Sequence, residues 1–373
     1  MGHSWPQSMQ LGARLFISNS NHMTAYRYLI QIAFIFFTLT SMHAGLFIYQ
    51  LGAPVQAEYW LYDSAIVKHH LAAHTSTPKV LVLGGSSTLF GIDSKMIESE
   101  LGLPTINLAL HAGFSFNHAF REAQQFLQPH DQVILGIEYY RYSRNRPYDR
   151  WFTNQVMSWN TDYFWTLSWF QRATFIHSVP WHRLAAGTLA QAFKAQSPVL
   201  IKRALRQHAQ ILEEHEQAQH ETSLAPRYLY SPRNINSHGD IRFSRTTPEL
   251  DDTDYGLTLP FESFNEVWDE FRAFAAYCRK KDITVWVIWA PTMKSAALNF
   301  GNPAVQAHIQ KLSQELRLLH WTILGSPVDF QYEKTLFADT ADHLMPEGRR
   351  TRTERILQEI RISSPTFPSA TLR

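Results

Sequence analysis

Two serines directly follow a segment that reads as a buried strand. The stretch KVLVLGGSSTLFGID, residues 79–93, runs through apolar residues into two glycines and then Ser86 and Ser87. In an open parallel sheet, ligands gather at the carboxyl ends of the strands, so a side chain on the first strand-to-helix turn points into the crevice where an active site forms. Either serine could therefore be a nucleophile.

A serine nucleophile needs a base, and the base needs an acid that fixes its tautomer and stabilises its cation. Near the carboxyl terminus, FADTADHLMPEG places Asp339, Asp342 and His343 in one polar loop. Adjacent side chains in an extended segment point to opposite sides, which disfavours Asp342 as the partner of His343. Asp339 lies four residues earlier, so one helix-like turn brings it under the imidazole. We predict Asp339 as the orienting acid, with Asp342 as the alternative, and expect Asp342 to face solvent or to bind backbone N–H groups.

An alternation of strands and helices must position these residues. Wholly apolar or β-branched segments predict strands, and segments with apolar residues every three to four positions predict helices. The predicted strands are KVLVLG, TINLAL, DQVILGI, ITVWVIWAP and a short one at 321–324; the predicted helices are SKMIESEL, SFNHAFREAQQFLQ, FNEVWDEFRAFAAYCRKKD, 305–319 and 347–360. This order predicts a three-layer α/β sandwich with a mostly parallel sheet.

The chain divides into a membrane part, an α/β domain and an insertion. We expect a cytoplasmic tail at 1–27, a transmembrane anchor at 28–51, a juxtamembrane linker at 52–78, an α/β domain at 79–143 and 261–362, an inserted, mainly helical cap at 144–260, and a tail at 363–373. The cap is too long for a simple connection. Its aromatic stretch RWFTNQVMSWNTDYFWTLSWF could stack on sugars or lie at a membrane surface, but we expect it to form core.

The anchor fixes the expected compartment. Tyr28–Leu51 contains no Asp, Glu, Lys or Arg, and a helix of that length crosses a hydrocarbon core of roughly 30 Å. Arg14 and Arg27 precede it, and the first charge after it is Glu58, so the positive-inside rule places the amino terminus in the cytoplasm. We expect a single-pass protein of the inner membrane with its domain in the periplasm. A cleaved signal peptide is the alternative, but the apolar run is longer than such segments usually are.

Composition excludes several classes of protein. The 34 basic and 32 acidic residues nearly cancel, which gives no footprint for nucleic-acid binding. One cysteine, Cys278, excludes an internal disulfide and a thiolate-rich metal site. The segment KHHLAAH sets His70 and His74 at i,i+4 spacing, but it lacks the glutamate of a zinc-protease helix, and we expect a polar helix face and no metal.

The order of the motifs resembles that of the SGNH (GDSL-type) hydrolase superfamily. GGSST resembles the nucleophile block and maps the catalytic serine onto Ser87, with Ser86 in the middle position. NLALHAG resembles the second block, so the resemblance implies an oxyanion hole formed by the N–H groups of Ser87 and Gly113. The likeness covers 79–142 and 264–359. Two departures are that GIEYYRYSRN lacks the asparagine of the third block and that Thr340 stands where Asp-x-x-His has its aspartate.

Among these proteins, the chain is similar to the membrane-anchored proteins of teichoic-acid D-alanylation and alginate O-acetylation. Those proteins work beside a membrane-bound O-acyltransferase on envelope polymers. The resemblance implies serine-dependent transfer of an acyl group, expected to be acetyl, to an envelope or exported polysaccharide, with no cofactor. An esterase acting on the same glycans and an inactive glycan- or partner-binding scaffold are the alternatives.

Two further residues are candidates for substrate binding. His111 lies beside the predicted oxyanion glycine and could touch substrate, or it could be a histidine satisfied at the end of its strand. Lys294 follows the late apolar strand and could contact an anionic substrate, although a solvated lysine is the default.

Overall fold

The computed structural model describes residues 7–55, 57–143, 148–193, 208–220, 230–242 and 249–363, and within 7–24 it describes only the helical backbone. Every structural statement below concerns these residues.

Five parallel strands form the central sheet in the order β2-β1-β3-β4-β6. Their bounds are β1 Val80–Gly84, β2 Thr105–Asn107, β3 Gln132–Ile137, β4 Thr284–Trp289 and β6 Thr322–Ile323. A separate parallel pair joins β5 Thr292–Met293 to β7 Gln331–Tyr332. The second strand is shorter than predicted. The N–H of Leu108 still donates to Val82 of β1 (2.8 Å), but the N–H of Ala109 donates to the Asn107 side chain (2.9 Å). The chain is thus an α/β protein with a mostly parallel sheet, as the sequence predicts.

The strand order places a crevice beside β1. The chain passes from β1 outward to β2 and then returns to form β3 on the other side of β1. At such a point the connections leave the sheet toward opposite faces, and a ligand-sized crevice opens at the carboxyl ends of the two strands. Here those ends are Gly84 and Ile137.

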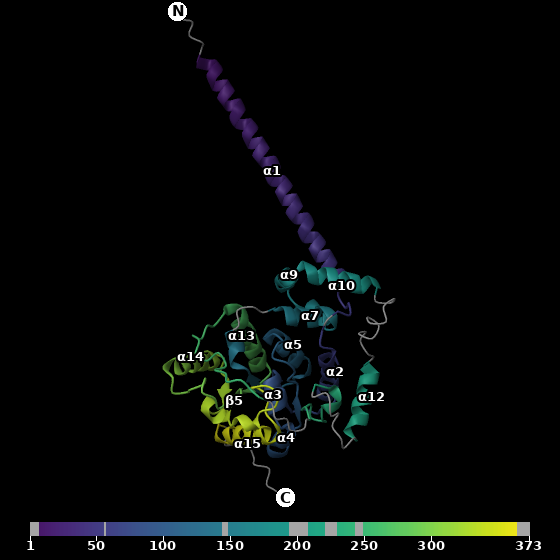
Figure 1. Cartoon of the computed structure of the whole chain (residues 1–373), viewed down its shortest axis with the longest axis vertical. Helices are drawn as coiled ribbons and strands as arrows, with labels where there is room; N and C mark the ends of the chain where they lie inside the picture. Colours follow the sequence, from purple (N-terminus) through teal and green to yellow (C-terminus); the bar gives the residue numbers. More distant parts are fainter. Residues whose placement is uncertain are drawn as a thin grey trace, which may run out of the picture.

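Helices pack on the sheet in two groups (Figure 1). On one side, α5 Phe116–Phe126 contacts α13 Asn265–Lys280; on the other, α15 Pro346–Ser363 contacts α3 Ser86–Gly91 and α4 Ser94–Leu101. A further helix, α14 Pro303–Leu318, lies beside β6. Short 3₁₀ turns lie at η1 Pro232–Asn234, η2 Pro327–Phe330 and η3 Lys334–Leu336.

The amino-terminal helix α1, Gln7–Tyr49, projects far from the body of the protein (Figure 1). Its stretch Ala25–Tyr49 is long and apolar enough to cross a membrane, and few of its residues are buried. The next helix, α2 Tyr59–Ala73, lies within the segment expected to be a linker. Leu61 and Val67 of α2 are wholly buried, so this segment packs as part of the fold.

The segment expected to be a cap is mainly helical where it is described. Its helices are α7 Arg150–Ser158, α8 Thr161–Thr166, α9 Trp169–Ser178, α10 Trp181–Phe193 and α12 His208–Gln219, preceded by the short α6 Tyr139–Tyr142. Phe152, Phe164 and Phe175 are buried in a second hydrophobic cluster with Phe47 of α1. Part of the aromatic stretch is therefore core, whereas Trp169 on α9 is 80% exposed.

Candidate active site

The serine turn joins the end of β1 to the start of α3. Close packing requires glycine at both Gly84 and Gly85. A Cβ on Gly84 would lie 2.0 Å from the carbonyl oxygen of Gly136, and one on Gly85 would lie 2.4 Å from a carboxylate oxygen of Glu138. Neither position has room for a side chain. The turn is thereby pressed against the carboxyl end of β3, at the crevice that the strand order creates.

The two serines of the turn differ in accessibility. Ser87 is 0% exposed, and its hydroxyl has no hydrogen-bond partner. Ser86 is partly exposed. On a helix, residues three or four apart share a face, so both Ser86 and Ser87 lie on the side of α3 that carries Phe90.

The acid–histidine loop precedes α15 and contacts α3 through the stacking of His343 on Phe90. The Nδ1 atom of His343 lies 2.8 Å from a carboxylate oxygen of Asp339, and the imidazole stacks on Phe90 with ring centres 4.2 Å apart. The contact predicted between Asp339 and His343 is present. Because Nδ1 is engaged by the acid, Nε2 is the nitrogen left to face a nucleophile. The stacking on Phe90 places the ring against the side of α3 that carries both serines.

Tyr230 completes the acid side of this arrangement. Its hydroxyl donates to the second carboxylate oxygen of Asp339 (2.5 Å) and lies 3.4 Å from Nδ1 of His343. Burial acts to raise the pKa of Asp339, but the hydrogen bonds from His343 and Tyr230 outweigh it and leave that pKa lowered. Asp339 therefore stays ionised beside the imidazole.

Asp342, expected to face solvent or to bind backbone N–H groups, is neither fully exposed nor fully buried. It is partly buried, and burial, followed by the negative charge of Glu138, raises its pKa to about 7. The structure thus gives the two aspartates of the loop opposite environments, one favouring the carboxylate and the other favouring the acid.

Glu138 was missed from sequence, and it lies at the centre of the serine side. It directly follows β3, in the place where the third block of the SGNH pattern has its asparagine, and it is 1% exposed. One carboxylate oxygen accepts from the N–H of Ser87 (3.0 Å), and the other lies 3.5 Å from the guanidinium of Arg141. Its position after a buried strand could have identified it, because polar residues there point into the crevice.

The second predicted oxyanion amide is also engaged. The N–H of Gly113 donates to Nδ1 of His111 (2.9 Å), and the His111 ring stacks on Trp151 with ring centres 4.2 Å apart. Burial lowers the pKa of His111 although nearby carboxylates oppose the shift, so its ring is disposed to remain neutral and to accept this hydrogen bond. Both amides predicted for the oxyanion hole are thus bound to side chains of the protein.

Lys294 belongs to a surface ion pair. Its ammonium lies 2.5 Å from a carboxylate oxygen of Glu333, and both side chains are more than half exposed. No described contact joins it to the serine turn or to the acid–histidine loop.

Tyr230, like Glu138, was not identified from sequence. It lies in a polar, proline-containing run of the insertion, more than a hundred residues from Asp339, and no spacing rule connects the two. Only the folded chain brings that hydroxyl to the acid.

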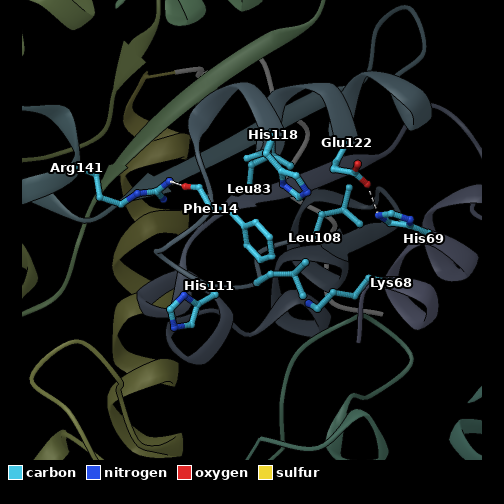
Figure 2. A pocket seen from close by; sticks show the side chains of 12 residues that line it. Lys68, His69, Leu83, Leu108, His111, Phe114, His118, Glu122 and Arg141 are labelled. Carbon is cyan, nitrogen blue, oxygen red and sulfur yellow. Dashed lines mark hydrogen bonds and ion pairs between the residues drawn. The ribbon is translucent and has the colours of Figure 1, made fainter. Parts of the chain in front are cut away.

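A small cavity lies behind His111 (Figure 2). Its volume is about 30 Å³, enough for a single water-sized guest, and Figure 2 shows Lys68, His118 and the ion pair of His69 with Glu122 around it. Burial lowers the pKa of Lys68 to about 7 and that of His118 to about 4. Within the described ranges no three His, Cys, Asp or Glu side chains converge as a metal site.

No protein-family model matches the sequence, and no curated protein matches it at a significant level. The functional assignment therefore depends on the site itself.

Proposed function

We propose that this chain is a membrane-anchored serine O-acyltransferase that acts on a cell-envelope or exported polysaccharide. The observation that carries the proposal is the pairing of His343 with Asp339, with the imidazole stacked against the helix that begins at the serine turn. A base held in one tautomer beside a glycine-softened serine turn is the requirement for nucleophilic acyl transfer. The SGNH-like order of these motifs supports the same assignment.

Burial favours Ser86 over Ser87 as the nucleophile. A hydroxyl with no access to solvent cannot meet an acyl donor, and Ser87 is in that position, whereas Ser86 is partly exposed. This argues against the assignment of Ser87 made from the sequence resemblance. Ser87 then contributes its backbone N–H at the turn.

In the proposed reaction, the serine oxygen attacks the carbonyl carbon of an acyl donor while His343 takes the hydroxyl proton. Asp339 stabilises the imidazolium that forms. His343 gives the proton to the leaving group, and an acyl-serine remains. A sugar hydroxyl then attacks this ester and passes its proton to His343, which returns it to the serine. The acyl group ends on the glycan.

The oxyanion formed in each step needs hydrogen-bond donors. The N–H groups of Ser87 and Gly113 are the candidates, and Glu138 and His111 now accept from them. We propose that Glu138 moves aside when substrate binds, because a carboxylate would repel the oxyanion.

The alternatives differ in what reaches the acyl-enzyme. An esterase uses water in place of the sugar hydroxyl, with the same residues. An inactive scaffold is favoured by one specific observation, which is the engagement of both predicted oxyanion amides by side chains.

Active-site labelling tests the proposal. Full-length protein in detergent is treated with a fluorophosphonate probe, and the adduct is located by mass spectrometry. We expect labelling at Ser86, retained in Ser87→Ala and lost in Ser86→Ala. An adduct at Ser87 would restore the sequence assignment. Absence of any adduct in protein that unfolds cooperatively would favour the scaffold.

Acceptor competition then separates transfer from hydrolysis. With an aryl acetate as donor, a transferase releases the phenol faster when acetylatable oligosaccharide is added and yields acetylated sugar. An esterase yields acetate at a rate that the sugar does not change.

The proposal also includes topology. The basic residues before the apolar stretch imply an extracytoplasmic carboxyl terminus. A carboxyl-terminal alkaline phosphatase fusion should be active, and activity only from a cytoplasmic reporter would overturn this part of the proposal.

A further inference from the structure

Two helices of the insertion, α9 and α10, carry an uncharged outer face. The exposed positions recur at helical i,i+4 spacing along each helix. They are Ser168, Trp169, Phe170, Ala173, Thr174, His177, Ser178, Trp181, His182, Ala185, Ala186, Leu189, Ala192 and Phe193. None is Asp, Glu, Lys or Arg. Of the two arginines of these helices, Arg183 is buried, and Arg172 is partly buried and donates to the carbonyl oxygen of Trp165. We call this surface the platform.

The platform exposes large apolar side chains to an unusual extent. Trp169 is 80% exposed, Phe170 66% and Leu189 60%. By contrast, α12 of the same insertion presents Glu213 and Glu216 outward. Large apolar side chains exposed together on two consecutive helices mark a surface that another apolar phase covers.

The platform helices contact the end of α1, the helix that could cross a membrane. His43 of α1 lies 3.1 Å from the carbonyl oxygen of Ile176 on α9, and its ring packs edge-on against Trp181 of α10. Phe47 of α1 packs on Phe175. Figure 1 shows α9 and α10 lying across the base of α1, at the end of the domain from which that helix projects.

These contacts fall at the depth where α1 would leave a bilayer. The apolar stretch Ala25–Tyr49 has 25 residues, about 37 Å of helix at ~1.5 Å per residue. A hydrocarbon core of roughly 30 Å takes up only about 20 of them. Counted from Ala25, those roughly 20 residues end at Ala44, so Phe47 lies in the headgroup region and His43 lies at the acyl boundary just below it. Helices α9 and α10 lie beside both residues.

An apolar groove joins the platform to α1. It has a volume of about 610 Å³ and is lined by Phe36, Leu39 and Ala44 of α1 and by Ala173, Ile176 and Trp181 of the platform helices. A groove that opens beside a membrane-crossing helix faces the acyl chains of that membrane.

We propose that the platform lies in the headgroup–acyl boundary of the bilayer that α1 crosses, with acyl chains of that leaflet filling the groove. Trp and Phe on an interfacial helix are favoured at this depth, and the uncharged face avoids the cost of burying charge there. The α/β domain is then held at a fixed height and tilt above the membrane. The proposal rests on α1 spanning the membrane and does not depend on the catalytic assignment.

Site-directed fluorescence quenching tests it in the full-length protein. Native Cys278 is buried, and burial raises the pKa of its thiol to about 12, so it does not compete for a thiol-reactive dye. The probe variants are Phe170→Cys on the platform, Phe34→Cys in α1 and Leu318→Cys on α14. All three replace well-exposed apolar residues, at 66%, 69% and 72% exposure. Each is labelled with NBD and placed in phosphatidylcholine nanodiscs with or without brominated acyl chains.

The expected result is strong quenching by brominated lipid at positions 34 and 170, by twofold or more, and none at 318. Quenching at 34 without quenching at 170 would overturn the platform while leaving the anchor in place. Quenching at neither would overturn both. If NBD at 170 becomes shielded from water only in native membranes, the face binds a protein, which also overturns the proposal. Should Phe170→Cys fail to fold, Leu189→Cys on α10 replaces it.

Discussion

The two halves of the candidate site are organised in opposite ways. On the histidine half, His343 is bound at Nδ1 by Asp339, and Tyr230 binds the acid in turn. On the serine half, the hydroxyl of Ser87 has no partner. The amides that should receive an oxyanion instead bind Glu138 and His111.

This difference indicates which half limits the reaction. A base that is already oriented needs no rearrangement when substrate arrives. An oxyanion site filled by the protein's own acceptors must first be vacated or neutralised. We infer that substrate entry at the serine half controls the rate, and that the histidine half supplies most of the catalytic effect once the serine half opens.

Removal of the base should have the largest effect. His343→Ala should lower the rate of fluorophosphonate labelling by about a thousandfold or more, because the serine hydroxyl loses its proton acceptor. In phenol release from an aryl acetate, adding Ser86→Ala to this variant should cost little further, since the two residues act as one unit. In-gel fluorescence follows the labelling rate of His343→Ala, and phenol absorbance follows acyl release in the single and double variants.

If His343→Ala labels as fast as the wild-type protein, the serine is activated by another group and the comparison fails. His308→Ala is a control substitution: this histidine is also buried, but it bonds to the carbonyl oxygen of Leu259.

Substitution of the acid should have the next largest effect. Asp339→Asn should slow labelling on the order of a thousandfold, because the amide cannot stabilise the imidazolium and favours the wrong tautomer. Asp342→Asn should slow it less than tenfold, since Asp342 makes no described hydrogen bond to the imidazole. A large loss confined to Asp342→Asn in an acyl-release assay would reverse the assignment of the acid.

Most of the framework could be predicted from sequence, because burial leaves a regular pattern. The apolar positions predicted for one face of the helix at 264–282 are buried in α13, apart from Phe264 at its start, which is partly exposed. The strands with wholly apolar sequences appear as β1, β3 and β4. The pair β5 and β7 was not predicted, because Thr292–Met293 follows a proline and Gln331–Tyr332 does not lie in an apolar run.

The histidine half was predictable for a local reason, and the serine half was not. Asp339 and His343 are four residues apart, so spacing alone limits their geometry. Which of Ser86 and Ser87 faces the crevice depends on the rotation of a six-residue helix against α15, which is a tertiary effect. The contact of Glu138 with that turn spans 51 residues and also depends on the assembled sheet.

Neutralising Glu138 should sharpen the comparison by removing the negative charge that an oxyanion would meet on the serine half. Glu138→Gln removes this charge and adds an amide that can donate to the oxyanion. We expect labelling about tenfold faster. Glu333→Gln, on the surface, is the control, since its partner Lys294 lies in an exposed ion pair.

Slower labelling in Glu138→Gln, with an unchanged unfolding temperature, would mean that the carboxylate itself takes part in the reaction. The contact of Glu138 with the N–H of Ser87 would then assist the reaction instead of blocking the oxyanion hole.

The smallest effect is expected from substitution of Tyr230. It tests whether Asp339 still orients His343 without the hydrogen bond from Tyr230. Tyr230→Phe keeps the ring and removes the hydroxyl that donates to Asp339. Burial, together with the neighbouring carboxylate, raises the pKa of Tyr230 above its ordinary value, so the hydroxyl is a donor at every working pH. Its loss should slow labelling about threefold to tenfold, the range of one net hydrogen bond.

The pH dependence of Tyr230→Phe separates this role from simple packing. Without the hydroxyl, the pKa of Asp339 should rise, because one of the interactions that lowers it is gone. An acid with a higher pKa takes up its proton at a higher pH, so the deficit relative to the wild-type protein should widen as pH falls from 7 toward 4. A deficit that is the same at every pH would assign Tyr230 to packing alone, and no deficit would mean that the contact of Asp339 with His343 suffices to hold the base.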